Sequence, residues 1–166
     1  DNSSMNYKKK KELFCGIENM TIVTPSKWLA DLVKKSFLGC YEVKVINNGI
    51  DTANFKPTDS DFKEKHGISD KEIVLGVASQ WDEGKGLYDF IKLSEMLDDK
   101  YKVVLVGLTK EQIETLPSKI LGINRTNSTK ELAEIYTSAK VFINPTYEDN
   151  YPTVNLEAQA CGTPVI

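Results

Sequence analysis

The chain has 166 residues, of which 40% are hydrophobic and 27% charged, and its formal net charge is −3 at pH 7. This length allows one domain with a proper core, and the composition is ordinary for a globular protein. The negative charge argues against nucleic acid as a partner, because duplex binding usually needs a basic stripe. No apolar run approaches the ~20 residues of a membrane span, and we expect no signal peptide. Three cysteines without metal spacing are typical of a reducing cytoplasm, and each is expected to be buried: Cys15, Cys40 and Cys161.

The first third of the chain predicts a basic helix followed by a strand–helix–strand unit. Residues 6–15 suit a helix, and its lysine run at 8–11 suits a solvated face or, as an alternative, contact with a membrane surface or a polyanion. The β-branched residues 21–24 predict a strand, and Ser26 is a good N-cap for the next helix. Residues 41–46 predict a second strand, and Asn47-Asn48-Gly49 predicts a tight turn. The intervening helix buries one face, defined by apolar residues at helical spacing: Leu29, Leu32, Val33 and Phe37.

The remainder alternates helices and strands with short connections. The all-apolar run 73–78 is typical of a parallel strand covered on both faces, and Ser128 with Glu131 predicts a capping box. This alternation predicts an α/β fold, a Rossmann-like, doubly wound domain with a mostly parallel sheet. The polar segment 51–60 is expected to join two βα units of that domain. The expected elements are helices at 61–65, 87–97, 110–115, 128–139 and 152–160, and strands at 73–78, 103–106, 120–123 and 141–143.

A possible phosphate loop follows the strand at 73–78. Residues 79–86 nearly match the phosphate loop of NTPases, but Ser79 replaces its first Gly and Gly86 replaces the Ser/Thr that would hold Mg²⁺, so we exclude ATP hydrolysis. Glycines on both sides of Lys85 would let the backbone approach a ligand, and Lys85 could neutralise a diphosphate. Taken alone, Lys85 also fits a solvated lysine in a turn.

Two acids near the end of the chain complement that lysine. Asp149 lies in the loop after the last predicted strand, and Glu157 lies in the helix that follows. Glu157 could accept hydrogen bonds from a ribose diol, while the N–H groups of Thr153 and Val154 could donate to a phosphate. Asp149 would then face a sugar hydroxyl. Alone, both acids also fit an ordinary surface, and no cluster of His and Cys predicts a metal site.

Six features of the chain occur in a recognisable order. They are Ile22–Ala30, Val45–Asp51, Phe55–Pro57, Lys85–Gly86, Asp149 and Glu157 with seven residues between them, and Ala160–Ile166. Together these features resemble the C-terminal half of glycosyltransferase family 4. The resemblance implies the C-terminal half of a GT-B enzyme, in which residues 1–166 form a single donor-binding domain, cut at both ends, and the N-terminal acceptor domain is absent.

The resemblance also implies roles for individual residues. Lys85 would contact the donor diphosphate and Asp149 the sugar near the reacting carbon, as the catalytic pair. Glu157 would bind the ribose. The other substrate-binding positions that it implies are Asn150, Tyr151, Thr153, Val154, Gln80 and, packed on the nucleobase, Arg125.

The implied enzyme is a retaining hexosyltransferase of cell-surface polysaccharide synthesis, such as that of bacterial capsule or lipopolysaccharide. It would use a nucleotide-sugar donor and a saccharide or lipid-linked acceptor, with no metal or cofactor. We expect a cytoplasmic protein, leave peripheral membrane association open, and expect this chain alone to be inactive.

Three positions depart from the family pattern and keep other readings open. Gln80 stands where an Arg is usual, Asp149 where a Glu is usual, and Pro152, which cannot donate an N–H, where a Gly is usual. The alternatives are therefore a non-catalytic sugar-nucleotide binding module and a GT-B relative such as a nucleotide-sugar epimerase.

Overall fold

The computed structural model describes residues 2–166, and the contacts of the chain fall into two compact units. The first unit is Asp1–Asn48 and the second is Gly49–Ile166. Each unit is described by itself. Among the described residues, no helix has both the length and the apolar character needed to cross a bilayer.

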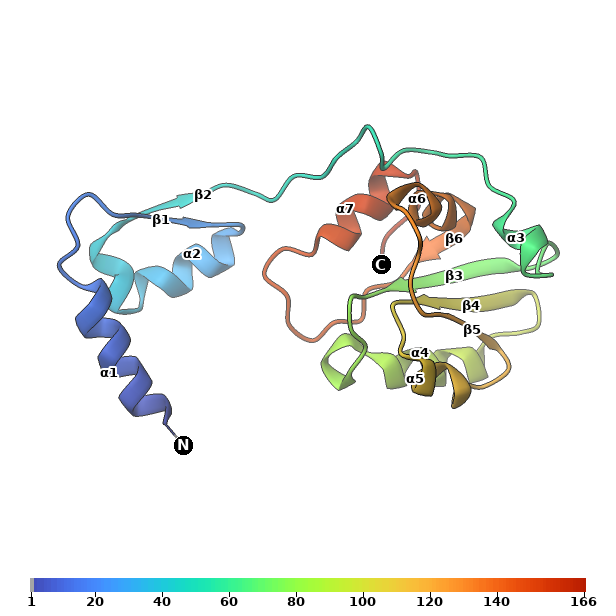
Figure 1. Ribbon diagram of the computed structural model, residues 1–166, viewed down its shortest axis with the longest axis horizontal. Coiled ribbons are helices and arrows are strands. Elements are labelled where there is room, and N and C mark those ends of the chain that lie inside the picture. Colours follow the sequence, from blue (N-terminus) through green and yellow to red (C-terminus); the bar gives the residue numbers. More distant parts are fainter. Residues whose placement is uncertain (1) are drawn as a thin grey trace. The chain divides into compact units, whose positions relative to one another are not determined.

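The first unit is a small two-stranded parallel sheet with helices (Figure 1). Strand β1 pairs with β2 from Thr21↔Glu42 to Thr24↔Val45. The hydroxyl of Ser26 caps α2 as predicted, accepting a bond from the Leu29 N–H at 3.2 Å. The elements are α1 (Ser3–Phe14), β1 (Thr21–Thr24), α2 (Lys27–Lys34), the 3-10 helix η1 (Phe37–Cys40) and β2 (Glu42–Val45).

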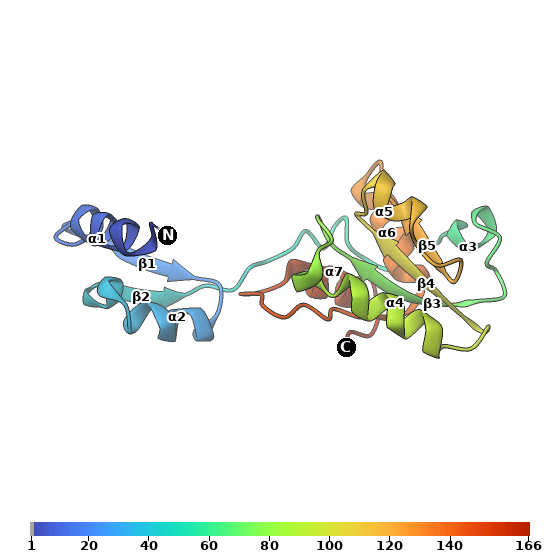
Figure 2. The same cartoon turned by 90° about the horizontal axis from the view of Figure 1, so that it is seen from below.

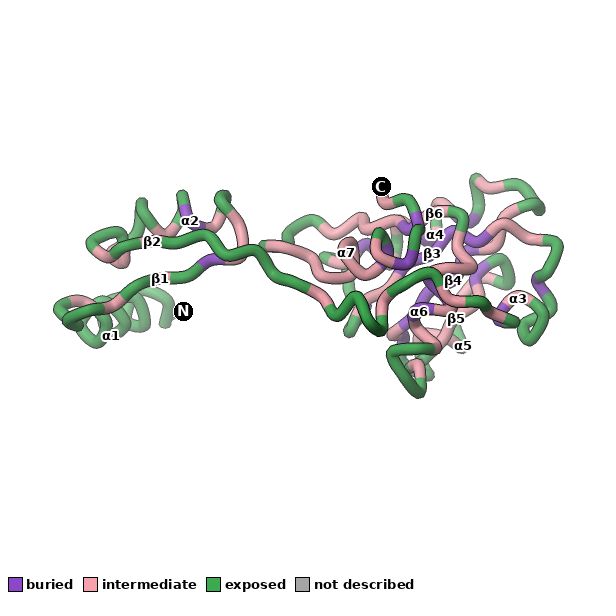
Figure 3. The backbone as a smooth tube through the Cα atoms, turned by 90° about the horizontal axis from the view of Figure 1, so that it is seen from above, coloured by how far each residue is buried: buried purple, intermediate pink, exposed green. Residues whose placement is uncertain are grey.

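Little of the first unit is buried. Of its described residues only Thr24 and Ala30 are buried, and most of its chain is exposed or half-buried in Figure 3. Large apolar side chains such as Trp28 and Ile46 remain exposed.

Three expectations for the first unit are wrong. Phe37 does not continue α2, because Ser36 starts η1 by accepting a bond from the Leu38 N–H at 3.1 Å, and Leu32 of the face expected to be buried is exposed. Residues 47–49 make no turn; the Asn47 amide donates instead to the Pro25 carbonyl at 2.8 Å, and Gly49 is not among the residues with positive φ. Cys40 is exposed.

The second unit is a four-stranded, all-parallel sheet with helices on both faces, which confirms the predicted fold class. Figure 1 shows α6 and α7 on one face and α4 and α5 on the other, and Figure 2 shows α4 running across β3 and β4. The strands are β3 (Glu72–Val77), β4 (Tyr101–Val106), β5 (Ile120–Ile123) and β6 (Ala139–Phe142). The helices are α3 (Phe62–Lys65), η2 (Glu83–Lys85), α4 (Leu87–Met96), α5 (Lys110–Glu114), α6 (Thr129–Ser138) and α7 (Thr153–Ala160).

Alternating residues of the central strands build two separate apolar layers. On β3, Leu75 packs into the layer under α6 and α7, while its neighbour Val74 packs into the layer under α4. Strand β4 divides its residues in the same way, with Val104 on one side and Val103 on the other. A strand covered on both faces needs apolar residues at every position, which explains the continuous runs in the sequence.

The order of strands in the sheet reverses at one place. Spatially the strands run β5-β4-β3-β6. The chain therefore moves outward from β3 to β4 and β5, and then returns to place β6 on the opposite side of β3. In open α/β sheets, the crevice at the carboxyl ends of the two strands flanking such a reversal is the usual place for a ligand.

The polar segment 51–60 follows a boundary that the sequence did not predict. It lies at the start of the second unit, just after the division between Asn48 and Gly49, rather than between two βα units of one sheet. The prediction that residues 1–166 form one donor-binding domain stays a prediction.

The helix caps follow the sequence only in part. The Ser128 hydroxyl caps α6 by accepting a bond from the Glu131 N–H at 3.1 Å, as predicted. The Glu131 carboxylate, however, accepts from the Asn127 N–H at 2.6 Å instead of that of Ser128. A complete capping box occurs at α5, where Thr109 and Gln112 bond each other reciprocally.

We predict that Gly107→Ala destabilises the second unit by roughly 2 kcal/mol or more. Gly107 has φ +99°, and a Cβ there would lie 1.7 Å from the Ala78 carbonyl oxygen, so the ends of β4 and β3 would have to separate. The denaturant midpoint followed by circular dichroism measures the loss. Gly49→Ala is the matched control, since a Cβ at Gly49 meets nothing within 4 Å. Equal midpoints for the two variants would contradict the prediction.

Candidate functional site

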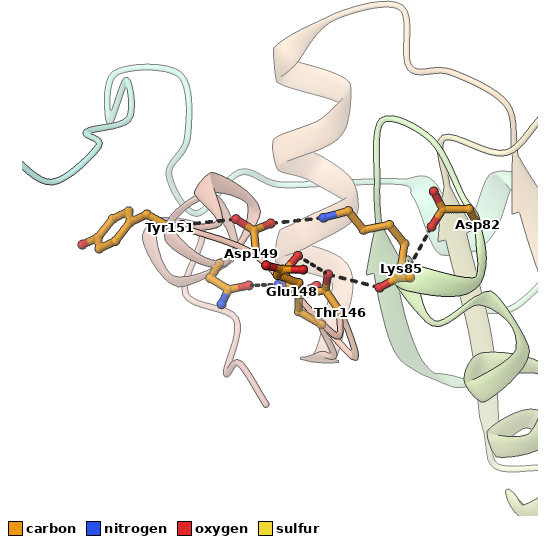
Figure 4. A network of polar contacts seen from close by, with 9 residues as sticks. Asp82, Lys85, Thr146, Glu148, Asp149 and Tyr151 are labelled. Carbon is orange, nitrogen blue, oxygen red and sulfur yellow. Dashed lines mark hydrogen bonds and ion pairs between the residues drawn. The ribbon is translucent and has the colours of Figure 1, made fainter. Parts of the chain in front are cut away.

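Two loops meet at the reversal between β3 and β6, and each brings one charged side chain. Lys85 comes from the loop after β3, and Asp149 from the loop after β6. The Nζ atom of Lys85 lies 3.1 Å from Oδ2 of Asp149 (Figure 4). The two side chains are 36% and 26% exposed, so the pair remains open to solvent at the edge of the sheet. The structure therefore brings together the lysine and the first acid that the sequence had singled out.

Two features fix the backbone around Lys85: a hydrogen bond from its N–H to the Asp82 side chain, and close packing of Gly86 against Pro145. The carboxylate of Asp82 accepts a bond from the Lys85 N–H at 2.9 Å, which closes the turn η2. Gly86 then directly precedes α4 as its N-cap, with φ +75°, and a Cβ there would lie 2.6 Å from Cγ of Pro145. Glycine is needed at this position both for its backbone conformation and for the contact between the two loops.

Hydrogen bonds tie the second loop to the first. The carbonyl of Gly84 accepts from the Tyr147 N–H at 3.0 Å and from the Thr146 hydroxyl at 3.3 Å. The hydroxyl of Tyr147 donates to Asp89 on α4 at 3.1 Å, and this bond to a carboxylate raises the pKa of Tyr147. The two loops thus form one connected structure, as the network in Figure 4 shows.

The segment from Asp149 to α7 presents backbone donors. Oδ1 of Asp149 accepts a bond from the Tyr151 N–H at 3.2 Å, while Oδ2 faces Lys85. Asn150 is exposed in this segment. Pro152 is the N-cap of α7 and makes no side-chain cap bond, so the first N–H groups of the helix, at Thr153 and Val154, have no side-chain cap. Such a helix start favours an anion.

The second acid, Glu157, lies one turn into α7 and is anchored from the interior. It is half-buried, and its Oε2 accepts a bond from the Tyr136 hydroxyl at 3.0 Å. Burial raises the pKa of Glu157, while hydrogen bonds from Tyr136 and Thr153 oppose that shift. Tyr136 is fully buried, and burial together with the nearby carboxylate raises its pKa strongly.

Tyr136 is a residue that the sequence analysis missed. It shares one face of α6 with Ala133, three residues earlier, and that face is buried. A buried tyrosine hydroxyl usually needs a polar partner, so the pattern could have signalled an interior anchor for a polar side chain. Asn144 was missed as well; its amide donates to the Asn155 side chain at 2.9 Å and links the end of β6 to α7.

The remaining candidate residues lie at the same edge of the sheet, at different distances from the reversal. Gln80 is exposed in the loop directly after β3. Arg125 is exposed in the loop after β5, and β4 separates β5 from β3 in the sheet. Since neighbouring strands lie about 4.8 Å apart, the strand that leads to Arg125 is about 10 Å from the one that leads to Lys85.

We predict that Glu157→Gln raises the thermal stability of the protein at neutral pH. The amide oxygen can still accept the Tyr136 bond, and no charge is then held in a half-buried place. Because the pKa of Glu157 is raised in the folded state, the wild type regains this stability as the pH falls through that pKa.

The advantage of the variant should therefore shrink between neutral pH and about pH 4. Thermal unfolding measured across this range tests the prediction. Glu95→Gln on the exposed side of α4 is the control, since Glu95 is exposed. A stability difference that does not change with pH would contradict the stated cause.

The chain is similar to bacterial glycosyltransferases of known name. It is 30% identical, over 109 residues, to the N,N'-diacetylbacillosaminyl-diphospho-undecaprenol alpha-1,3-N-acetylgalactosaminyltransferase of Campylobacter jejuni, covering 63% of this chain and 28% of that protein. It is 26% identical, over 164 residues, to the alpha-galactosylglucosyldiacylglycerol synthase of Streptococcus pneumoniae, covering 90% of this chain and 43% of that protein. The chain thus spans less than half the length of these relatives.

Solved glycosyltransferase structures share the fold. Sucrose-phosphate synthase from Thermosynechococcus elongatus matches 98% of this chain and 43% of its own, with a TM-score of 0.78 and 19% identity. Anabaena Alr3699/HepE, solved in complex with UDP-glucose, matches 98% of this chain and 48% of its own, with a TM-score of 0.73 and 16% identity.

The sequence profile described as "Glycosyl transferases group 1" matches residues 58–166, which lie within the second unit and include both acids and Lys85. The match covers more than half of the chain and agrees with the resemblance drawn from its motifs. The chain therefore belongs to the group 1 glycosyl transferases, a family of GT-B fold.

Proposed function

We propose that this chain is the donor-binding part of a retaining glycosyltransferase that uses a nucleoside-diphosphate sugar. The observation that carries the proposal is the contact between Lys85 and Asp149 at the strand reversal. Lys85 is a cation that suits a diphosphate, and Asp149 is an acid that suits a sugar hydroxyl. The two meet at the place where open α/β sheets usually bind their ligands. The complexes of Anabaena Alr3699/HepE with UDP-glucose and with UDP support a donor of this class.

The diphosphate would lie between Lys85 and the start of α7. Lys85 offers a mobile ammonium group, and the N–H groups of Thr153 and Val154 offer fixed donors at a helix N-terminus. These groups would stabilise the negative charge that develops on the departing nucleoside diphosphate. In this arrangement the protein itself supplies the positive charge, and no metal ion is needed.

The acids would hold the two sugar rings of the donor. Glu157 would accept hydrogen bonds from the ribose hydroxyls, and Asp149 would orient the transferred sugar near its reacting carbon. Asn150 and Tyr151 would line the sugar, while Gln80 and Arg125 would lie toward the diphosphate and the base. An acceptor hydroxyl would then attack the reacting carbon on the face from which the diphosphate leaves, which retains the configuration at that carbon.

The acceptor in this proposal is a saccharide or a lipid-linked saccharide of a cell-surface polysaccharide. The names of both bacterial relatives contain a lipid, undecaprenol in one and diacylglycerol in the other, which supports a lipid-linked acceptor. Such an acceptor would bring a cytoplasmic enzyme to the inner face of the membrane.

We predict that Glu157→Ala weakens the binding of the donor nucleotide at least about tenfold, because a ribose diol would lose its hydrogen-bond acceptor. Calorimetric titration of the full-length protein with UDP, GDP and ADP, and then with their sugars, identifies the nucleotide and measures the loss. Glu95→Ala is the control, as an exposed glutamate on α4. Unchanged affinity in Glu157→Ala would remove the ribose role, and binding without any sugar transfer would favour the non-catalytic module.

We predict that Asp149→Asn binds the nucleoside diphosphate more tightly than the wild type and transfers no sugar. In the free protein the Asp149 carboxylate forms an ion pair with Lys85, so a diphosphate that binds Lys85 must displace this carboxylate. Removing that charge should tighten UDP binding a few-fold, since an exposed ion pair is worth up to about 1 kcal/mol.

Asp149→Glu is the matched variant because it keeps the charge and should not tighten binding. Titration with UDP and a transfer assay with the matching donor sugar measure both effects. Weaker UDP binding by Asp149→Asn would show that the carboxylate does not compete for Lys85.

A further inference from the structure

Tyr136 is held in the core from several sides. Its ring packs edge-on against Phe142 of β6, with ring centroids 5.6 Å apart, and against Phe55, at 6.3 Å. Its carbonyl accepts a bond from the buried hydroxyl of Thr163, in the segment after α7. The side chain is fully buried, and its hydroxyl donates to Oε2 of Glu157 at 3.0 Å. The phenol ring is thus held in the core, and its hydroxyl contacts the side chain of Glu157 on α7.

We propose that Tyr136 is a positioning residue for nucleotide binding, which holds one carboxylate oxygen of Glu157 from inside so that the carboxylate is presented to the ribose in a fixed direction. The proposal rests on the ribose role of Glu157 argued above. In this proposal, a residue on the buried face of α6 supports the ligand-binding site at the start of α7.

The chemistry of the pair favours this role over simple core filling. A phenylalanine would fill the same apolar space under α6, so packing alone does not call for the hydroxyl. A glutamate side chain has several rotatable bonds, and anchoring it before the ligand arrives reduces the ordering that binding requires. A carboxylate can accept about four hydrogen bonds, so the bond from Tyr136 leaves capacity for both ribose hydroxyls.

The same bond also favours the charged form of Glu157. Burial favours the neutral form of this carboxyl and raises its pKa, whereas a hydrogen bond from the Tyr136 hydroxyl favours the ionised form. The titratable groups that face Glu157 are Tyr136 on α6 and Cys161 at the end of its own helix, and the Thr153 hydroxyl also contacts it. Loss of the Tyr136 hydroxyl should therefore raise the pKa of Glu157 further.

Tyr136→Phe in the full-length protein tests the proposal through two readouts. We expect affinity for the bound nucleoside diphosphate to fall about tenfold at pH 7, the scale of a lost bond to a charged group. We also expect the pH below which binding weakens to move upward. Tyr101→Phe is the matched control, since Tyr101 packs in the other apolar layer, with α4. In a Glu157→Gln background, Tyr136→Phe should leave the pH dependence of binding unchanged.

A measurement on the wild type covers the case in which the variant does not fold. With ¹³C label at tyrosine Cζ, the Tyr136 signal should titrate with the same midpoint as the Glu157 carboxyl. Separate midpoints, or an unchanged affinity and pH profile in folded Tyr136→Phe, would overturn the role of Tyr136 while leaving the proposed function intact. If the wild type binds no nucleoside diphosphate, the proposed function itself fails, so the two failures are distinguishable.

Discussion

The candidate site depends on one constraint, the reversal of strand order between β3 and β6. All four strands of the second unit are parallel, so their carboxyl ends share one edge. At the reversal the connections of two neighbouring strands run in opposite directions, and open α/β sheets usually bind their ligands at such a place. Lys85 and Asp149 meet there although they are 64 positions apart in the sequence. The apolar layers on both faces of the sheet matter to function because they hold β3 and β6 side by side.

The candidate site combines a solvent-exposed ion pair with a hydrogen bond that is anchored in the core. Lys85 and Asp149 are both partly exposed, so their attraction is weakened by water and a ligand can exchange partners with them. Glu157 is different, because it is half-buried and its hydrogen-bond donor, Tyr136, lies inside the core. A mobile contact suits a group whose charge changes during a reaction, and an anchored contact suits a part of the ligand that only has to be held.

The sequence predicted what depends on local chemistry and repeating patterns. The apolar runs located β3 to β6 within a few residues, and Ser26 and Ser128 were identified correctly as caps. The expected convergence was found for Lys85 and Asp149. This convergence could be predicted because the carboxyl ends of parallel strands lie at one edge of a sheet. The apolar pattern of the sequence does not show which strands are neighbours.

Features that depend on tertiary contacts could not be predicted. The chain divides after Asn48, because β1 and β2 pair only with each other, and pairing partners are not written in local patterns. Asn47 looked like a turn residue, but its side-chain amide donates to the Pro25 carbonyl and residues 47–49 form no turn. Tyr136 was not singled out from the sequence, and only the fold shows that its hydroxyl reaches Glu157.

The bonds from Thr146 and Tyr147 to the Gly84 carbonyl have a consequence for how such a protein can diversify. The segment that would contact the transferred sugar is bonded to the carbonyl of Gly84, which is the residue directly before Lys85 in the turn η2. An insertion or a change of loop length on either side would disturb both ends at once. Evolution toward a new sugar should therefore proceed by exchanging side chains at constant loop length, with compensating changes appearing in the two loops as pairs.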